Sequence, residues 1–281
     1  MKILVTGGAG FIASHITDAF INAGHDVVVL DDLSTGFEKN VNPKAKFVKA
    51  NICDPNLAKL FEEEKFDIVN HHAAQMDVRR SVNDPAFDAN TNIIGTINLL
   101  QNSVKYGIKK FMFASTGGAV YGEQEYFPAD EQHPTSPVSP YGISKLAVEK
   151  YLFFYNKQYR LNYSILRYAN IYGPRQNPFG EAGVIAIFTT KLLNGEQPVI
   201  NGDGLQTRDY VYVGDVVKAN LLTLNETGEK IFNVGTAKET NVNEIFSTLN
   251  FIIGNGQKEK HGPTAPGEQL RSVISSEKLY K

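Results

Sequence analysis

The chain has 281 residues, and its 28 Lys and Arg nearly balance its 30 Asp and Glu, giving a formal net charge of −2. That length is enough for one large domain or for a domain with a smaller lobe, and the charge argues against nucleic acid as a main partner. Cys53 is the only cysteine, so intrachain disulfides are impossible and a cytoplasmic location is expected. No apolar run approaches bilayer length, which predicts no membrane association, and residues 1–6 have the pattern of a core strand, not of a signal peptide.

The first 31 residues predict a dinucleotide site. A strand over 1–6 is followed by glycines at 7, 8 and 10, a helix ending near Gly24 and a second strand over 26–31. Such glycines let the backbone approach a diphosphate at a helix N-terminus, and Asp31 can bind ribose hydroxyls. A glycine cluster can also be a structural turn, but the whole unit favours the binding function. Because an acid at Asp31 would repel a 2′-phosphate, the predicted cofactor is NAD and not NADP.

The chain then alternates between short β-rich runs and helical stretches. Strands are expected near 47–48, 68–70, 111–114 and 164–167, and helices near 56–64, 86–106 and 140–159. This alternation is typical of an α/β fold, here a Rossmann-type doubly wound parallel sheet. Frequent Gly and Pro after residue 173 predict a smaller C-terminal substrate-binding lobe. The expected division is a Rossmann domain over 1–172, to which 209–236 return, and a lobe made of 173–208 and 237–281. A helix over 213–224 should be capped by Asp215.

The helix from residue 140 carries the clearest chemical signal. Ser139 can cap it and Pro140 can occupy its first turn. Tyr141 and Lys145 share one face, so the ammonium group can favour the phenolate, as can the helix N-terminus. A tyrosine prepared in this way can accept a proton from an alcohol that is being oxidised.

The same helix has an apolar band wider than one buried stripe requires, from Leu146 to Tyr155. The band could pack against 86–106 and a second copy of the chain, making a homodimer. Burial within one copy is the alternative.

Six motifs occur in order along the chain. They are Thr6–Ile12, Asp31–Ser34, His72–Gln75, Ser115–Gly122, Tyr141–Lys145 and Asn170–Arg175. In this combination the chain resembles the extended short-chain dehydrogenase/reductase family and, within it, most closely the UDP-glucose (UDP-galactose) 4-epimerases. The lobe would then bind a UDP-sugar.

The resemblance implies a mechanism. Tyr141 would take the proton of the sugar C4 hydroxyl while tightly bound NAD takes a hydride from C4. The 4-keto sugar would then rotate about its diphosphate and receive the hydride on its other face. Lys145 would hold the cofactor ribose and lower the pKa of Tyr141. Thr116 is the preferred hydroxyl for the C4 oxygen and Ser115 the second choice, whereas an ungapped match would place Gly117 there.

Cofactor contacts are implied for a set of residues at the ends of the predicted strands: Gly7, Gly10, Phe11, Ile12, Asp31, Asp32, Asn51, Ile52, Ala73, Ala74, Gln75, Tyr141, Lys145 and Tyr168. Asn51 stands where the family usually has aspartate, but its carbonyl can still accept from the adenine amine. His71 and His72 have no suitably spaced partners for a metal, and we interpret His72 as a packed residue at a strand end.

Substrate contacts are also implied by the resemblance. Asn170, Arg208 and Arg271 are expected at the diphosphate, with a surface salt bridge as the alternative for each arginine. Gly183, Val184 and the 199–203 loop are expected near the uracil. Glu268 would bind ribose or pair with Arg271. Ser272 falls where a tyrosine closes the sugar pocket in epimerases restricted to unacetylated hexoses, so acetylated sugars should fit.

Three other functions are alternatives to epimerisation. Related 4,6-dehydratases carry an Asp-Glu pair where this chain has Gly117 and Gly118, and glycines cannot move protons. A nucleotide-sugar oxidoreductase or decarboxylase of the same superfamily is the main alternative. A non-catalytic NAD sensor would have the same fold but no need for Tyr141 and Lys145.

Overall fold

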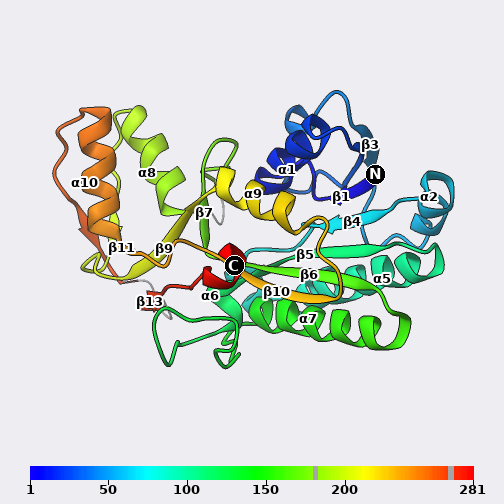
Figure 1. Ribbon diagram of the computed structural model, residues 1–281. Helices are drawn as coiled ribbons and strands as arrows, with labels where there is room; N and C mark the ends of the chain where they lie inside the picture. The colour runs from blue at the N-terminus through cyan, green and yellow to red at the C-terminus, as the bar shows by residue number, and fades with distance from the viewer. Residues whose placement is uncertain (180–182, 265–268) are drawn as a thin grey trace.

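A parallel sheet of seven strands forms the centre of the computed structural model, which describes residues 1–179, 183–264 and 269–281 (Figure 1). The strand order is β10-β6-β5-β4-β1-β2-β3. The strands are β1 (Lys2–Thr6), β2 (Asp26–Asp31), β3 (Lys46–Lys49), β4 (Ile68–His71), β5 (Lys110–Thr116), β6 (Asn162–Tyr168) and β10 (Glu229–Val234). The predicted Rossmann-type sheet is confirmed.

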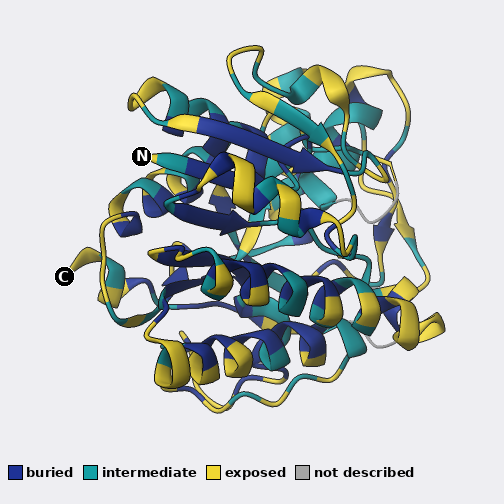
Figure 2. Ribbon diagram, turned by 90° about the vertical axis from the view of Figure 1, so that its right-hand side faces the viewer, coloured by how far each residue is buried: buried dark blue, intermediate teal, exposed yellow. Residues whose placement is uncertain are grey.

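Helices cover both faces of this sheet. Helices α1 (Phe11–Asn22) and α9 (Val213–Thr223) lie on one face, and α2 (Leu57–Glu64), α5 (Gly95–Lys105) and α7 (Pro140–Tyr159) lie on the other. Side chains alternate along β1, where Ile3 and Val5 pack toward α1 and Leu4 packs toward α2 and α5. The central strands are therefore buried on both sides, as their colour in Figure 2 shows.

The helix expected over 86–106 is divided. It consists of α4 (Pro85–Ala89), a π-helical turn (Asn90–Ile94) and α5, and it follows the short α3 (Val78–Asn83). The amide of Asn92, within the π turn, donates to the Gln75 carbonyl and to Asp88, at 2.9 and 3.0 Å. The wider turn thus accompanies a buried polar contact that the apolar periodicity did not reveal.

The predicted cap of α9 is wrong. The helix begins at Val213 directly after β9 (Thr207–Tyr212), with Tyr212 at the cap position and no side-chain cap. Asp215 instead lies in the first turn and pairs with Lys218 at 2.8 Å. An acid there still interacts favourably with the helix dipole.

A smaller lobe lies beside the carboxyl ends of the strands (Figure 1). Its four-stranded sheet joins β9 to β7 (Asn170–Tyr172), β11 (Glu239–Asn241) and β13 (Arg271–Ser272). The pair β8 (Ile200–Asn201) and β12 (His261–Gly262) is separate, and helices α8 (Val184–Leu193) and α10 (Val242–Ile253) pack through Phe188 and Phe246. The remaining elements are a 3₁₀ turn (Glu38–Asn40), α6 (Gly117–Val120) and α11 (Glu277–Tyr280). Over the described ranges, no helix is both long and apolar enough to cross a membrane.

A buried ion pair ties α7 to the sheet. The Arg167 guanidinium on β6 donates to both carboxylate oxygens of Glu149 on α7, at 3.0 and 2.6 Å, and each residue is 4% exposed. Ser115 on β5 donates to the same carboxylate at 2.6 Å, and Arg167 also donates to the Tyr121 hydroxyl at 3.0 Å. The Glu149 carboxylate therefore joins the carboxyl ends of β5 and β6 to the helix that carries Tyr141.

Replacing Arg167 with methionine should destabilise the protein strongly. The Arg167→Met substitution leaves Glu149 buried without its counter-ion, which costs about 3–5 kcal/mol of unfolding free energy. Denaturant unfolding measures the loss. The double variant Arg167→Met with Glu149→Leu removes both charges and should recover part of it. A single-variant loss below about 1 kcal/mol, a surface-pair value, would contradict this reading.

Candidate active site

A cavity of about 740 Å³ lies at the carboxyl ends of the strands, across β1 and β4 where the strand order reverses. It is lined by all the residues predicted to contact NAD, namely Gly7, Gly10, Phe11, Ile12, Asp31, Asp32, Asn51, Ile52, Ala73, Ala74, Gln75, Tyr141, Lys145 and Tyr168. Ser115 and Thr116 line it as well. Arg80, Arg175 and Asn177 also line it and were not predicted as contacts, although Arg175 is the last residue of the Asn170–Arg175 motif.

The glycine turn forms one wall of the cavity. Gly7 has φ +71, and a Cβ there would lie 2.7 Å from the Ala73 nitrogen, so no side chain fits. Gly10 caps α1 without a side-chain hydrogen bond, so the first N–H groups of the helix have no side-chain acceptor there and can bind an anion. Together with the acid at the end of β2, this wall fits a dinucleotide.

Asp31 and Asp32 lie at the adenosine end expected for that dinucleotide. The Asp31 carboxylate accepts from Ala9 N at 3.0 Å and from Leu33 N at 2.8 Å, and burial nevertheless raises its pKa. Asp32 accepts from the Asn51 amide at 2.7 Å, and the Asn51 carbonyl accepts from Cys53 N at 2.8 Å. One of the two lone pairs on the side-chain oxygen of Asn51 is therefore used within its own turn, and the other is left for the adenine amine.

Tyr141 and Lys145 lie where α7 meets the cavity. Ser139 caps the helix by accepting from Gly142 N at 3.1 Å, and Pro140 is its first residue, as predicted. Lys145 is 4% exposed and donates to the Ala114 carbonyl at 2.9 Å. Its nitrogen lies 5.8 Å from the centre of the Tyr141 ring.

The pKa of Tyr141 is raised, which is opposite to the direction expected from its spacing to Lys145. Burial is the largest cause, and the charge of Asp88 adds to it. Burial also lowers the pKa of Lys145 to about 8, while Asp88 and Glu149 oppose that shift. Helical spacing correctly predicts that the two side chains share one face. It contains no information on burial, and the free-energy cost of removing both charged forms from water here exceeds the attraction between them.

Asp88 is a functional candidate that the motifs did not reveal. It is fully buried and accepts from the Ser144 hydroxyl at 2.6 Å and from the Gln75 and Asn92 amides at 3.0 Å. Only the folding of α4 against α7 places this carboxylate near Tyr141 and Lys145. Together with Glu149, its charge favours the ammonium form of Lys145.

Ser115 and Thr116 turn their hydroxyl groups in different directions. Ser115 is committed to Glu149, within the buried ion-pair cluster. Thr116 accepts from Ala119 N at 3.2 Å, and its oxygen lies 4.0 Å from where a Cβ on Gly118 would be. The same point lies 3.8 Å from the Ser272 hydroxyl and 3.9 Å from the side-chain oxygen Oδ1 of Asn170. Gly118 therefore leaves open a space that three predicted residues from distant segments surround.

The two predicted arginines have different surroundings. Ser272 pairs with Arg208 in the β13–β9 register, whereas Arg271 pairs with Thr207 on the opposite side. Arg271 donates to both oxygens of Glu239 at 2.8 and 2.7 Å and lies 3.7 Å from the centre of the Phe127 ring. These contacts match the salt-bridge alternative for Arg271. Glu268 lies outside the described residues.

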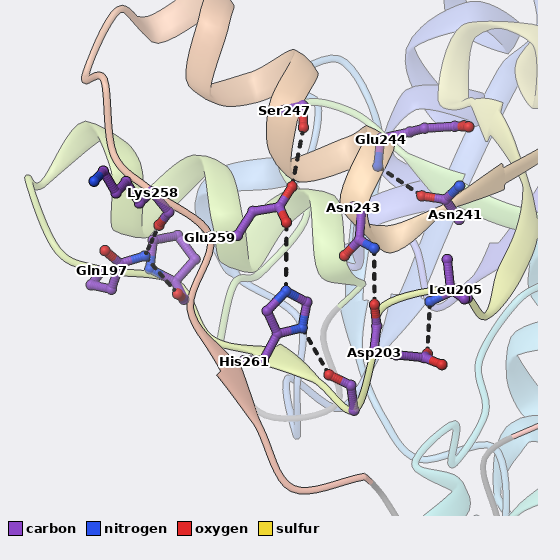
Figure 3. Close-up of polar contacts among 12 residues, drawn as sticks. Gln197, Asp203, Leu205, Asn241, Asn243, Glu244, Ser247, Lys258, Glu259 and His261 are labelled. Carbon is purple, nitrogen blue, oxygen red and sulfur yellow. Dashed lines mark hydrogen bonds and ion pairs between the residues drawn. The ribbon is translucent and has the colours of Figure 1, made fainter.

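The 199–203 loop, expected near the uracil, accepts side-chain hydrogen bonds at two of its backbone carbonyls (Figure 3). The His261 ring donates to the Gly202 carbonyl at 2.8 Å, and Asn243 donates to the Asp203 carbonyl at 2.9 Å. Gly183 and Val184 begin α8 and do not line the cavity described above. These contacts fix the loop between β12 and the start of α10.

Neutralising Asp88 should lower the pKa of Lys145. The Asp88→Asn substitution removes a negative charge that favours the ammonium form, so the lysine should titrate below its present value of about 8. Side-chain ¹⁵N NMR of labelled lysine measures this directly. Asp84→Asn, a conservative change at an exposed helix cap in the same segment, serves as the control. An unchanged or higher Lys145 pKa in Asp88→Asn would refute the electrostatic role.

Comparison with known proteins agrees with this geometry. A putative UDP-glucose 4-epimerase of Methanocaldococcus jannaschii is 51% identical over 276 residues, covering 98% of this chain and 90% of the relative. A crystal structure of UDP-glucose 4-epimerase with UDP-glucose from Thermotoga maritima superposes with a TM-score of 0.97 at 48% identity, covering 99% and 91% of the two chains. A Thermus thermophilus UDP-glucose 4-epimerase in complex with NAD gives 0.94 at 43% identity, covering 100% and 92%. Residues 3–235 match the NAD dependent epimerase/dehydratase family, and the chain belongs to that family of extended short-chain dehydrogenases/reductases.

Proposed function

We propose that this protein is a UDP-hexose 4-epimerase that interconverts UDP-glucose and UDP-galactose. The observation that carries the proposal is the meeting of Tyr141, Lys145 and Thr116 at one cavity, beside a position where Gly117 and Gly118 supply no further acid or base. The names of the relatives support the same reaction.

In this mechanism Tyr141 accepts the proton of the C4 hydroxyl, and Thr116 donates a hydrogen bond to the C4 oxygen. NAD, when bound, supplies the hydride acceptor and donor. Lys145 holds the ribose and, as a cation, stabilises the phenolate when the tyrosine ionises. Asn170 and Arg208 hold the UDP-sugar by its diphosphate, about which the keto sugar turns before Tyr141 returns the proton.

The family also contains dehydratases, which must remove protons from C5 and C6. The positions after Thr116 are Gly117 and Gly118, which have no side chain to do so. The remaining alternative is an oxidoreductase or decarboxylase that acts on a nucleotide sugar and releases NADH.

The deciding experiment follows UDP-galactose by proton NMR with purified protein and no added NAD. Epimerisation predicts conversion to UDP-glucose, with no NADH absorbance accumulating. Conversion that requires added NAD and produces equivalent NADH would favour the oxidoreductase.

Thr116 and Ser115 can be separated by substitution. Thr116→Val should lower turnover by roughly 10²–10⁴-fold, the range of one proton-handling contact. Ser115→Ala should lower stability by about 1 kcal/mol, through its lost hydrogen bond to Glu149, and leave turnover nearly unchanged. Steady-state kinetics and denaturant unfolding of both variants test this. The reverse pattern of turnover would make Ser115 the catalytic hydroxyl.

We further propose that the sugar pocket accepts an acetamido group. Ser272 is 4% exposed and borders the space beside Gly118, as does Asn170. Because the serine side chain is small, it leaves room in that space for a larger substituent on the sugar. The wild type should turn over both UDP-galactose and UDP-N-acetylgalactosamine, and Ser272→Tyr should selectively lower kcat/KM for the acetylated sugar. If the wild type acts on UDP-galactose alone, another group closes the pocket.

A homodimer through α7 is proposed because an apolar surface remains on this helix and its neighbour. Ile94, Ile143, Phe153 and Phe154 are 53%, 54%, 49% and 50% exposed. The double variant Phe153→Asp and Phe154→Asp should be monomeric by light scattering after gel filtration. Phe251→Asp, on the exposed side of α10, is the control and should keep the wild-type mass. A monomeric wild type would contradict the proposal.

A further inference from the structure

Two segments from opposite halves of the central sheet border the cofactor cavity. The segment after β2 contributes residues 34–37 and Asn40, and the segment after β7 contributes residues 175–177 and Phe179. Strand β2 lies on one side of β1 in the strand order, whereas β6, which is followed in the chain by β7, lies on the other side. The two segments are therefore far apart in sequence and reach the cavity from different halves of the fold.

One carboxylate on α1 binds both segments. Asp18 accepts from the Asn42 amide at 2.7 Å through Oδ1 and from the Arg175 guanidinium at 2.8 Å through Oδ2. Asn42 lies two residues after the first set of wall residues, and Arg175 is the first residue of the second set. Among the described residues that line the cavity, neither Asp18 nor Asn42 occurs. Asp18 thus links the two walls from outside the cavity.

The segment after β7 is held against α1 by a second contact. His15, one helical turn before Asp18, donates from Nε2 to the Pro174 carbonyl at 2.9 Å. Arg175 itself has φ +67, a left-handed conformation that is unfavourable for a residue with a Cβ. Such a conformation persists where the surrounding contacts fix it. Two successive residues are therefore bound to α1 at the point where the backbone beside the cavity is strained.

These contacts oppose widening of the cavity. If the two segments move apart, at least one of the hydrogen bonds to Asp18 must break. We propose that Asp18 is a positioning residue that binds Asn42 and Arg175 at once, keeps the two segments together beside the cofactor, and so slows the release of NAD. The inference concerns only the cofactor of the family, and so it does not depend on which sugar nucleotide is converted.

Release of NADH, a fluorescent form of the cofactor, tests this role without any turnover. Nucleotide-free protein is loaded with NADH and mixed with excess NAD, and the loss of bound NADH fluorescence gives the release rate. The Arg175 and Asp18 side chains are 33% and 28% exposed, so each contact is modest. Asp18→Ala should speed release about 5-fold, the effect of losing one partly exposed ion pair and one hydrogen bond. The association rate should stay nearly unchanged.

Two further variants separate this role from a general effect on the fold. Asn42→Ala should speed release by itself but have no further effect in Asp18→Ala, because its partner is then already absent. Asp26→Ala is the matched control, since Asp26 lies at the opposite end of β2 from the cavity and is a 68% exposed acid that pairs with Lys2. It should keep the wild-type rate. High salt should speed release in the wild type more than in Asp18→Ala, because it screens the pair with Arg175.

A wild-type release rate in Asp18→Ala would overturn the inference, and a lower unfolding midpoint of that variant would then assign Asp18 to stability alone. An effect of Asn42→Ala that persists in Asp18→Ala would also overturn it, because Asn42 would then act without the carboxylate. So would faster release in Asp26→Ala equal to that in Asp18→Ala, since any lost surface acid would then have the same effect.

Discussion

Removal of Tyr141 and Lys145 from water is the constraint on which the site depends. Burial opposes the charge of each group, so a lone lysine at this position would lose its proton readily. Asp88 and Glu149 oppose that tendency, each from a different network. Asp88 accepts hydrogen bonds from the Gln75 and Asn92 amides and from the Ser144 hydroxyl. Glu149 forms its ion pair with Arg167. The charge of Lys145 is thus favoured by two carboxylates that are held in separate buried networks.

This arrangement also explains why the two hydroxyl groups at the end of β5 are not equivalent. Ser115 belongs to the Glu149 cluster, which fixes α7 on the sheet, and Thr116 faces the space left by Gly118. One residue therefore contributes to the position of the helix, and the hydroxyl of the next borders the open space beside Gly118. Alternation along a strand produces such a division whenever a strand end borders a cavity.

Local sequence patterns predicted what depends on local structure. The glycine turn, Asp31 at the end of β2, and Ser139, Tyr141 and Lys145 at the start of α7 have the predicted places because turns, caps and helical spacing fix them over a few residues. The parallel sheet was predictable as well, because strands that alternate with helices along a chain form parallel sheets.

Features set by distant contacts could not be predicted in this way. Asp88 lies within an ordinary helical stretch and becomes important only where α4 packs against α7. The pairing of Arg271 with Glu239 depends on the register of β11 and β13 against β9, which no motif encodes. The raised pKa of Tyr141 likewise depends on burial by the whole fold, a quantity that spacing along one helix does not contain.

Hydride return to the same carbon is the central claim, and isotopic labelling tests it most directly. UDP-galactose carrying deuterium at C4 would be incubated with the protein in ordinary water, without added NAD. The mechanism proposed here predicts UDP-glucose that retains deuterium at C4, because the label never exchanges with solvent. Product carrying hydrogen at C4 would contradict it.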